Sequence, residues 1–244
     1  MHPILFRIGN VNIYSYGFMV SLGFLAGILL AYYLARKVKI DPDKILDAAL
    51  FLFVGAIFGA RLFYVIFFWH ELNSPWQAFM VWNGGLVFYG GVLFGILGLI
   101  LACKILKISV LDMLDIVAPA TMLGYAFGRI GCFLNGCCYG EECAFVFPWA
   151  VKFPHLTGLR YPTQIYASIA GLLIFAVLFF LLSRRKFPGQ IFAVGLSLYA
   201  TYRFFIEFFR TNAKVFLNLT LAQWASLFLV VLGLIFYFIY KKRR

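Results

Sequence analysis

Charged residues are scarce in this chain of 244 amino acids: only 12% are Asp, Glu, Lys or Arg, and 9 acidic residues face 21 basic ones. So little charge excludes a water-soluble domain, because a surface in contact with water needs many more charged groups. Hydrophobic residues make up 64% of the sequence, and the mean hydropathy is +0.94. These values predict a polytopic membrane protein.

Histidine is also rare, with three copies, and the five cysteines do not follow the pattern of a metal site. The adjacent pair Cys137 and Cys138 lacks the C-x-x-C spacing of zinc and thioredoxin-like sites. We therefore expect no metal and no cofactor. Free cysteines that act as small apolar residues are the default interpretation, and a disulfide among Cys132, Cys137, Cys138 and Cys143 stays open.

Seven stretches are apolar over about 20 residues, the length that a helix needs to cross a bilayer. We expect spans near residues 14–35, 46–69, 85–105, 112–134, 164–183, 190–209 and 220–240. No soluble domain, low-complexity tract or clear internal repeat accompanies them. The predicted fold is an all-α integral membrane protein, with residues 1–244 forming a single domain of seven transmembrane helices.

Lysine and arginine are distributed unevenly between the two sides of these spans. Thirteen lie in the connections after spans one, three and five or in the tail, and five lie on the opposite side. The thirteen are Arg36, Lys37, Lys39, Lys44, Lys104, Lys107, Arg184, Arg185, Lys186, Lys241, Lys242, Arg243 and Arg244. The positive-inside rule therefore predicts an outside N-terminus and a cytoplasmic C-terminus. Because the basic residues sit in short clusters at the ends of apolar runs, we expect no nucleic-acid partner.

Three further arginines, Arg61, Arg129 and Arg203, lie inside spans. With the orientation above, all three fall in the outer half of the membrane, where Tyr16 and Tyr89 also open their spans. Burying a guanidinium in hydrocarbon is costly, so an intramembrane arginine usually has an anionic partner or lines a watery cavity. The commonest anion in a membrane is a lipid phosphate. We therefore expect a lipid-phosphate site in the outer leaflet.

One face of span six carries a polar stripe. Tyr199, Arg203, Glu207 and Arg210 are spaced i, i+4, i+8 and i+11. Glu207 can pair with Arg203 or, across the cavity, with Arg129. The alternative interpretation of Glu207 is a structural ion pair that fixes the helix register. Because three intramembrane cations face one carboxylate, positive charge is left over for an external anion.

The segment at the end of span four, from Gly128 to Gly140, reads GRIGCFLNGCCYG. Small residues allow helices to pack closely in membranes, which accounts for glycines here but not for Arg129 and Asn135 between them. Glycine also leaves space for a ligand. An arginine with space beside it favours a site for an anion.

This segment resembles the signature of the bacterial prolipoprotein diacylglyceryl transferase family, and other motifs of that family follow in order along the chain. They are Tyr16-Gly17, Gly59-x-Arg61, Gly84-Gly85 through Gly90-Gly91, Arg160-x-Pro162-Thr163-Gln164-x-Tyr166 and Tyr199-x-x-x-Arg203-x-x-x-Glu207-Phe208-Phe209-Arg210. The resemblance implies a seven-span enzyme of the bacterial inner membrane, with its active site toward the outer leaflet. It implies transfer of the diacylglyceryl group of phosphatidylglycerol to the lipobox cysteine of preprolipoproteins, forming a thioether and releasing glycerol phosphate.

The resemblance and the charge pattern together predict the site residues. The expected catalytic residues are Arg129, Arg203, Tyr89 and Glu207. Phosphatidylglycerol is expected to contact Arg129, Arg203, Tyr16, Arg61, Asn135, Tyr199 and Gly140. The nucleophile belongs to the substrate, and the lipid brings its own leaving group, so the reaction needs no cofactor.

Three positions depart from the pattern of the family. Tyr89 stands where a histidine, often proposed as the base, is common, while Cys137 replaces a glutamate and Cys132 an asparagine. A phenol with a reference pKa of about 10 is a poor base near neutral pH. Two alternatives therefore stay open: a catalytically silent paralogue that binds lipid or carries out thiol redox chemistry, and a transporter of an anionic solute or lipid.

The charge distribution predicts which loops a reporter fusion finds on each side of the membrane. Fusions at Lys107, Lys186 and Lys242 should report the cytoplasm, and fusions at Trp76, Lys152 and Lys214 should report the outside. An outside reading at Lys242 would contradict the depths assigned to the intramembrane arginines, because those depths were inferred from this orientation.

Overall fold

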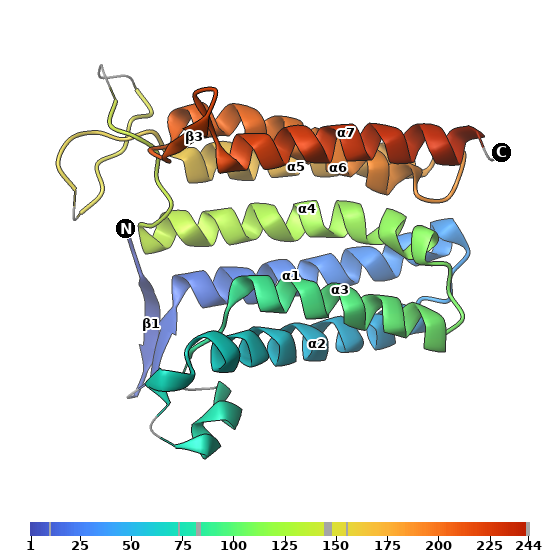
Figure 1. Ribbon diagram of the computed structural model, residues 1–244, viewed down its shortest axis with the longest axis horizontal. Coiled ribbons are helices and arrows are strands. Elements are labelled where there is room, and N and C mark those ends of the chain that lie inside the picture. Colours follow the sequence, from blue (N-terminus) through green and yellow to red (C-terminus); the bar gives the residue numbers. More distant parts are fainter. Residues whose placement is uncertain (10, 73, 82–83, 144–147, 155, 243–244) are drawn as a thin grey trace. The chain divides into compact units, whose positions relative to one another are not determined.

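The computed structural model contains seven helices that are long and apolar enough to cross a membrane (Figure 1). It describes residues 1–242 except 10, 73, 82–83, 144–147 and 155, so Arg243 and Arg244 of the basic tail lie outside the described residues. The helices are α1 (Ser15–Ala35), α2 (Asp43–Phe67), α3 (Phe88–Ile105), α4 (Val110–Asn135), α5 (Thr163–Leu182), α6 (Gln190–Ile206) and α7 (Leu221–Lys242). The prediction of an all-α protein with seven spans is confirmed.

The helix ends differ from the predicted spans by up to three residues, for local reasons. Helix α2 begins at Asp43 rather than at residue 46. Its first turn contains Asp43 and Lys44, and a search for apolar stretches leaves such polar residues out. Helix α3 begins at Phe88 rather than 85, because Gly84 (φ +83°) and Gly85 (φ +68°) are left-handed and cannot belong to it. Helix α6 ends at Ile206 and continues as a short 3-10 turn.

Short elements connect the helices. Strands β1 (Ile4–Ile8) and β2 (Val11–Tyr14) form an antiparallel hairpin before α1, and β3 (Lys214–Phe216) and β4 (Leu219–Thr220) form another before α7. The 3-10 turns are η1 (Arg36–Val38), η2 (Trp69–Glu71), η3 (Pro75–Phe79) and η5 (Glu207–Phe209). Neither hairpin was predicted, because both lie in loops that the search for apolar spans passes over.

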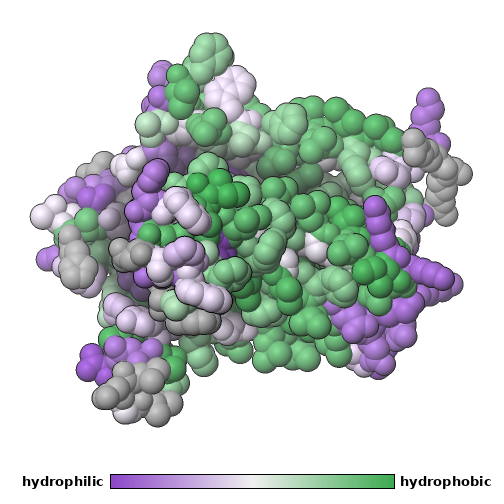
Figure 2. Space-filling model, turned by 60° about the horizontal axis from the view of Figure 1, so that its bottom comes forward, coloured by the Kyte–Doolittle hydropathy of each residue, from purple (hydrophilic) through white to green (hydrophobic). Residues whose placement is uncertain are grey.

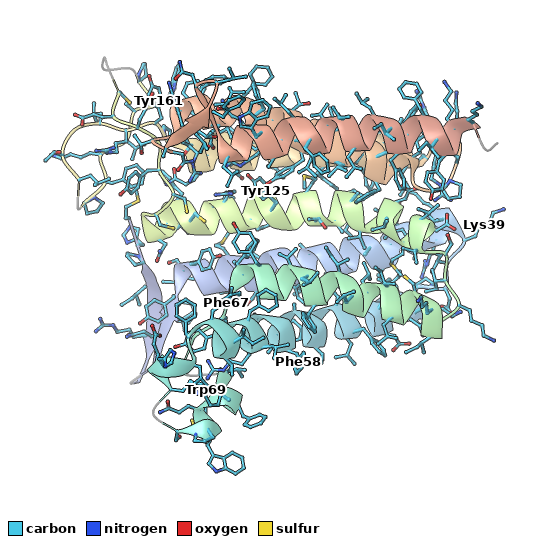
Figure 3. The ribbon with its side chains drawn as sticks, in the orientation of Figure 1. Lys39, Phe58, Phe67, Trp69, Tyr125 and Tyr161 are labelled. Atoms are coloured by element: carbon cyan, nitrogen blue, oxygen red, sulfur yellow. The ribbon has the colours of Figure 1, made fainter. Side chains whose placement is uncertain are left out.

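The chain divides into two compact units, and each is described by itself. One comprises Met1–Ala31 with Leu114–Arg244, and the other comprises Tyr32–Met113. The single domain inferred from the sequence stays a prediction. Hydrophobic side chains cover the lengths of the helices, and hydrophilic ones gather toward helix ends (Figure 2). Large apolar side chains such as Phe58 and Phe67, both on α2 (Figure 3), are more than half exposed, as expected of surfaces that face lipid.

In the unit Tyr32–Met113, helices α2 and α3 approach each other through glycines. A Cβ at Gly55 would lie 2.5 Å from the carbonyl oxygen of Phe94, and a Cβ at Gly98 would lie 2.5 Å from that of Phe51. Such contacts leave no room for a side chain, so these glycines set the spacing of the helices. Close backbone packing through small residues is a common source of helix association in membranes.

In the other unit, α4 lies between α1 on one side and α5 to α7 on the other (Figure 1). A Cβ at Gly23 of α1 would lie 3.0 Å from the carbonyl oxygen of Gly124, and a Cβ at Gly171 of α5 would lie 3.0 Å from the ring of Tyr125. Helix α4 is therefore fixed on both sides at the depth where its polar residues begin. This is the helix that carries Arg129.

Asp115, near the start of α4, is fully buried and connects α4 to the beginning of α6. Its carboxylate forms an ion pair with Arg185 (Nη1 to Oδ2, 3.0 Å) and accepts the backbone N–H groups of Gly189 (2.8 Å) and Phe192 (2.9 Å). The first N–H groups of a helix have no partner within the helix. The carboxylate therefore caps α6, the helix that carries Arg203.

We expect Asp115→Asn to lower the free energy of unfolding by about 2 kcal/mol, because the ion pair is lost and the single amide oxygen can keep only one of the two positions that accept backbone N–H groups. Thermal unfolding in detergent micelles measures the effect. The matched control is Asp47→Asn, a change at an exposed carboxylate of α2. Equal melting temperatures for the two variants would contradict a capping role for Asp115.

Candidate active site

A small pocket lies among residues near the end of α4, the start of α5 and the end of α6, within one unit. It is lined by Tyr125 and Arg129 of α4, Thr163 and Ala167 of α5, Tyr202, Arg203 and Ile206 of α6, and Arg210 after the 3-10 turn η5. Three guanidinium groups therefore surround a single small cavity. Arg129 and Arg203, which the charge counts assign to one depth, both belong to this lining, and their roles at the site stay predictions.

Arg129 is held by an aromatic ring rather than by a carboxylate. Its guanidinium carbon lies 4.9 Å from the ring centre of Tyr125, one helical turn earlier on α4. In the part of the chain that the structure describes, Arg129 forms no ion pair. A Cβ built on neighbouring Gly128 meets no described atom within 4 Å, so that position has room for a methyl group. A cation that is held by a ring and lines a pocket can receive an anion.

Arg203 pairs with Glu207 one turn later, as one of the two predicted pairings has it. Glu207 is buried, and its Oε1 accepts hydrogen bonds from Asn212 Nδ2 (2.6 Å) and Thr220 Oγ1 (2.9 Å), while its Oε2 accepts one from Arg203. The carboxylate thus joins the end of α6 to the hairpin before α7. With all its described partners in place, Glu207 orients Arg203 toward the pocket.

Arg210 completes the set of cations, although the sequence placed it at the membrane exit of span six. It lines the pocket, and the ion pairs of the described chain do not include it. Glu207 balances one of the three arginines, so the pocket keeps a surplus of two positive charges. The sequence already assigned Arg210 and Arg203 to one polar stripe, because residues seven positions apart share one helix face.

Two tyrosines of the pocket, Tyr125 and Tyr202, were missed by sequence reasoning. Tyr125 packs edge-to-face on Tyr199 (ring centres 5.6 Å apart), and Tyr199 in turn contacts Tyr202. Tyr199, which was predicted to bind lipid, lies behind Tyr125 and does not line the pocket. Their positions in the sequence could have identified them. Tyr125 lies four residues before Arg129, and Tyr202 lies four residues before Ile206, so each shares a helix face with another residue of the pocket.

The end of the glycine-rich segment forms a turn held by α5. Gly136 (φ +76°) and Cys138 (φ +64°) are both left-handed, which folds the chain back after α4. Gln164 Nε2 donates to the carbonyl oxygen of Cys137 (2.7 Å), and Thr163 Oγ1 donates to that of Cys138 (3.0 Å). The motif before span five therefore positions the signature of span four.

Gly140 anchors this turn by close packing. A Cβ there would lie 2.5 Å from the carbonyl oxygen of Phe209 and 2.8 Å from side-chain atoms of Thr163 and Tyr161. Its N–H donates to the carbonyl oxygen of Tyr161 (2.9 Å; labelled in Figure 3). Gly140 does not line the pocket, and these contacts favour a packing role over the predicted contact with lipid.

Three thiols meet at the end of α4. The Sγ atoms of Cys132, Cys137 and Cys138 all lie within 4.8 Å of one another, and the five cysteines are free thiols. Asn135, predicted to contact lipid, hydrogen-bonds the thiol of Cys137. Burial raises the pKa of the Cys137 thiol, whereas a hydrogen bond with Cys132 lowers the pKa of the exposed Cys138 thiol to about 5.

The remaining predicted residues lie at other places. Tyr16 is half exposed at the start of α1, where its backbone packs on α4: a Cβ at Gly131 would lie 3.3 Å from its Cα. Tyr89 and Arg61 belong to the unit Tyr32–Met113, and Tyr89 is 78% exposed at the first turn of α3. Their expected roles at the site stay predictions.

Arg61 is bound by backbone carbonyl groups. Its guanidinium donates to the carbonyl oxygens of Ala78 (2.9 Å), Gly84 (2.7 Å), Gly85 (3.0 Å) and Gln77. The side chain is buried, and a charged group buried in a membrane protein is stabilised by such donors and acceptors. These bonds hold the loop between α2 and α3, and they favour a structural role over lipid binding.

Seven apolar helices and a pocket lined by three arginines define a polytopic membrane protein with a cationic site. The chain belongs to the prolipoprotein diacylglyceryl transferase family, whose family model matches residues 3–239. This confirms the resemblance found in the sequence.

Relatives of similar length carry the name phosphatidylglycerol–prolipoprotein diacylglyceryl transferase. The relative from Finegoldia magna is 35% identical, over 100% of this chain and 97% of its own. The relative from Clostridium botulinum strain Langeland is 35% identical, over 100% and 99%. The relative from Trichormus variabilis is 34% identical, over 95% and 87%.

The two flanking glycines of the signature should respond differently to a methyl group. We expect Gly140→Ala to lower the free energy of unfolding by about 1–3 kcal/mol, because its Cβ collides with backbone and side chains. Gly128→Ala, the matched control, should melt like the parent protein because its Cβ enters open space. Thermal unfolding in micelles measures both, and a lower melting temperature for Gly128→Ala would contradict the space assigned at Gly128.

Proposed function

We propose that this protein transfers the diacylglyceryl group of phosphatidylglycerol to the cysteine thiol of the lipobox in preprolipoproteins. The reaction forms a thioether and releases glycerol phosphate, the first step of bacterial lipoprotein maturation. The observation that carries the proposal is the pocket with a surplus of two positive charges, in a chain whose full-length relatives bear the name of this activity.

The proposed reaction is accelerated by cations near the leaving group. The thiolate of the acceptor peptide attacks the glycerol carbon that bears the phosphate, and the carbon–oxygen bond to phosphate breaks. Negative charge then grows on the departing phosphate. Arg129 and Arg203 stabilise this charge from positions fixed before the reaction, which is an efficient form of catalysis. Glu207 holds Arg203 in place, so it acts as a positioning residue.

The other polar groups bind or orient the substrates. Arg210 supplies a third cation for the phosphate, and the Tyr125 ring supports Arg129. We propose that Tyr16 and Tyr89 orient the phosphate or the incoming thiol. The lipid brings its own leaving group, so these residues account for substrate binding and for departure of the phosphate. They do not account for removal of the proton from the acceptor thiol.

We place the protein in the bacterial inner membrane as a multi-pass protein, with the site toward the outer leaflet. The excess of basic residues after spans one, three and five supports this orientation. Both substrates are then accessible: phosphatidylglycerol in the leaflet, and preprolipoproteins as they emerge on the outer face.

Arginine replacements test the proposal. We expect Arg129→Ala and Arg203→Ala each to lower the transfer rate by at least about a hundredfold, since each removes a donor that stabilises the leaving group. Lysine at either position should restore little, because it cannot hold phosphate with two parallel hydrogen bonds. The assay follows lipidation of a lipobox peptide with phosphatidylglycerol in micelles.

The matched control is Arg184→Ala, a change at an exposed arginine after α5 that should leave the rate unchanged. Complementation of a strain depleted of its own transferase provides the same comparison in cells. Near-normal lipidation by Arg203→Ala, with the protein inserted normally, would refute the phosphate site.

A further inference from the structure

The three thiols at the end of α4 have the spacing of a metal site. All the Sγ atoms of Cys132, Cys137 and Cys138 lie within 4.8 Å of one another. Thiolates bound to one tetrahedral zinc at about 2.3 Å stand roughly 3.8 Å apart. Small side-chain rotations are therefore enough to bring the three sulfurs onto one ion.

The backbone conformation and hydrogen bonds to α5 hold this arrangement. Left-handed conformations at Gly136 and Cys138 fold the chain back, so that residues five and six positions after Cys132 return to it. The carbonyl groups of Cys137 and Cys138 are fixed by Gln164 and Thr163 of α5. A site whose ligands are positioned by second interactions binds metal more tightly and in a defined geometry.

We propose that Cys132, Cys137 and Cys138 bind one Zn²⁺ and leave its fourth position open for the thiol of the acceptor peptide. The role of this site rests on the proposed function, while the binding of zinc does not. Structural zinc sites have four protein ligands, whereas catalytic sites have three and an open position. The described chain supplies three clustered thiols, which matches the catalytic kind.

The site lies beside the cationic pocket. Arg129 precedes Cys132 by three residues on α4 and so shares its helix face. Thr163 lines the pocket and also binds the carbonyl group of Cys138. Cys132 is buried, whereas Cys138 is exposed, so a peptide can reach the cluster from one side. A thiol bound there would stand next to the phosphate that the arginines hold.

The zinc site accounts for deprotonation of the peptide thiol, which the arginines do not perform. The peptide thiol displaces a water from zinc and gives up its proton to solvent, because a coordinated thiol is deprotonated. The sulfur electron pair then forms the bond to the glycerol carbon, and the pair of the breaking carbon–oxygen bond leaves with glycerol phosphate. The neutral thioether is a weaker ligand, so water replaces it. No oxidant or reductant takes part.

A metal-binding measurement tests the site by itself. The full-length protein, purified in detergent with a reductant, is loaded with zinc sulfate, desalted and analysed by mass spectrometry for metal content. We expect one zinc per chain, and at least about tenfold weaker binding after Cys132→Ser, Cys137→Ser or Cys138→Ser. Substitution with Co²⁺ should give a sulfur-to-cobalt absorption band that each of these changes weakens.

Two matched controls sharpen the measurement. Cys143→Ser, in the same loop but outside the cluster, should keep the zinc. His2→Ala should also keep it: the backbone N–H of His2 donates to the carbonyl oxygen of Leu134 (3.0 Å), so this histidine is a rival fourth ligand. Loss of zinc in His2→Ala would indicate a closed four-ligand site and would overturn the open position. Zinc that stays bound after all three cysteines are replaced would overturn the site.

A disulfide is the competing use of these thiols. If Cys132 and Cys137 form a disulfide in protein purified without reductant, and the reduced protein takes up no zinc, the proposal fails and a redox role replaces it. Peptide mapping by mass spectrometry distinguishes these results, because it reports the linkage and the free thiols separately.

An activity measurement completes the test. A free cysteine with a reference pKa of about 8.5 is roughly 3% thiolate at pH 7, so full ionisation is worth up to about thirtyfold in rate. Removing zinc with a chelator should therefore slow lipidation by at least about tenfold, and added zinc should restore it. Unchanged lipidation by zinc-free protein would overturn the catalytic role but leave the proposed function standing. Zinc bound by the three cysteines in a protein that lipidates nothing would instead refute the proposed function.

Discussion

An arginine inside a bilayer needs a partner, and this chain satisfies each of its intramembrane arginines in a different way. Arg61 donates to four backbone carbonyl groups and becomes part of the frame of its own unit. Arg203 takes the buried Glu207 and is thereby aimed at the pocket. Arg129 has an aromatic ring instead of a carboxylate, and it lines the pocket. The incomplete compensation of Arg129, together with that of Arg210, leaves the pocket with surplus positive charge, on which the proposed binding of an anion rests.

Helix α4 carries the arginine that has no carboxylate partner, and the helices around it fix its position. Glycine contacts with α1 and the packing of α5 fix its position, and its last two turns carry Arg129 and Cys132. The signature that ends it contains two kinds of glycine: Gly131 and Gly140 have close neighbours, whereas a Cβ at Gly128 would meet no described atom within 4 Å. One short segment thus provides packing, charge and thiols within a few residues of one another.

The sequence was sufficient for the seven spans, because apolar length alone decides whether a helix can cross a bilayer. Charge counts also assign Arg129 and Arg203 to one depth, and both line the same pocket. The sequence was not sufficient for Arg61, whose partners are loop carbonyls that carry no side-chain signal. The thiol cluster also escaped prediction, because it depends on left-handed residues and on hydrogen bonds from α5, neither of which C-x-x-C spacing describes.

The three departures from the family pattern, at positions 89, 132 and 137, can be understood as one change. A tyrosine stands at position 89, where a histidine base is common, and a neutral phenol does not take a proton from a thiol near pH 7. Cysteines stand at positions 132 and 137, where an asparagine and a glutamate are common, and with Cys138 they form the cluster. A chain that loses its base must lower the pKa of its nucleophile by other means. In the site we propose, a zinc ion held by three thiolates would do so at the nucleophile itself, because the metal would bind the sulfur that reacts. The loss of a base and the gain of three metal ligands would then be complementary parts of one mechanism.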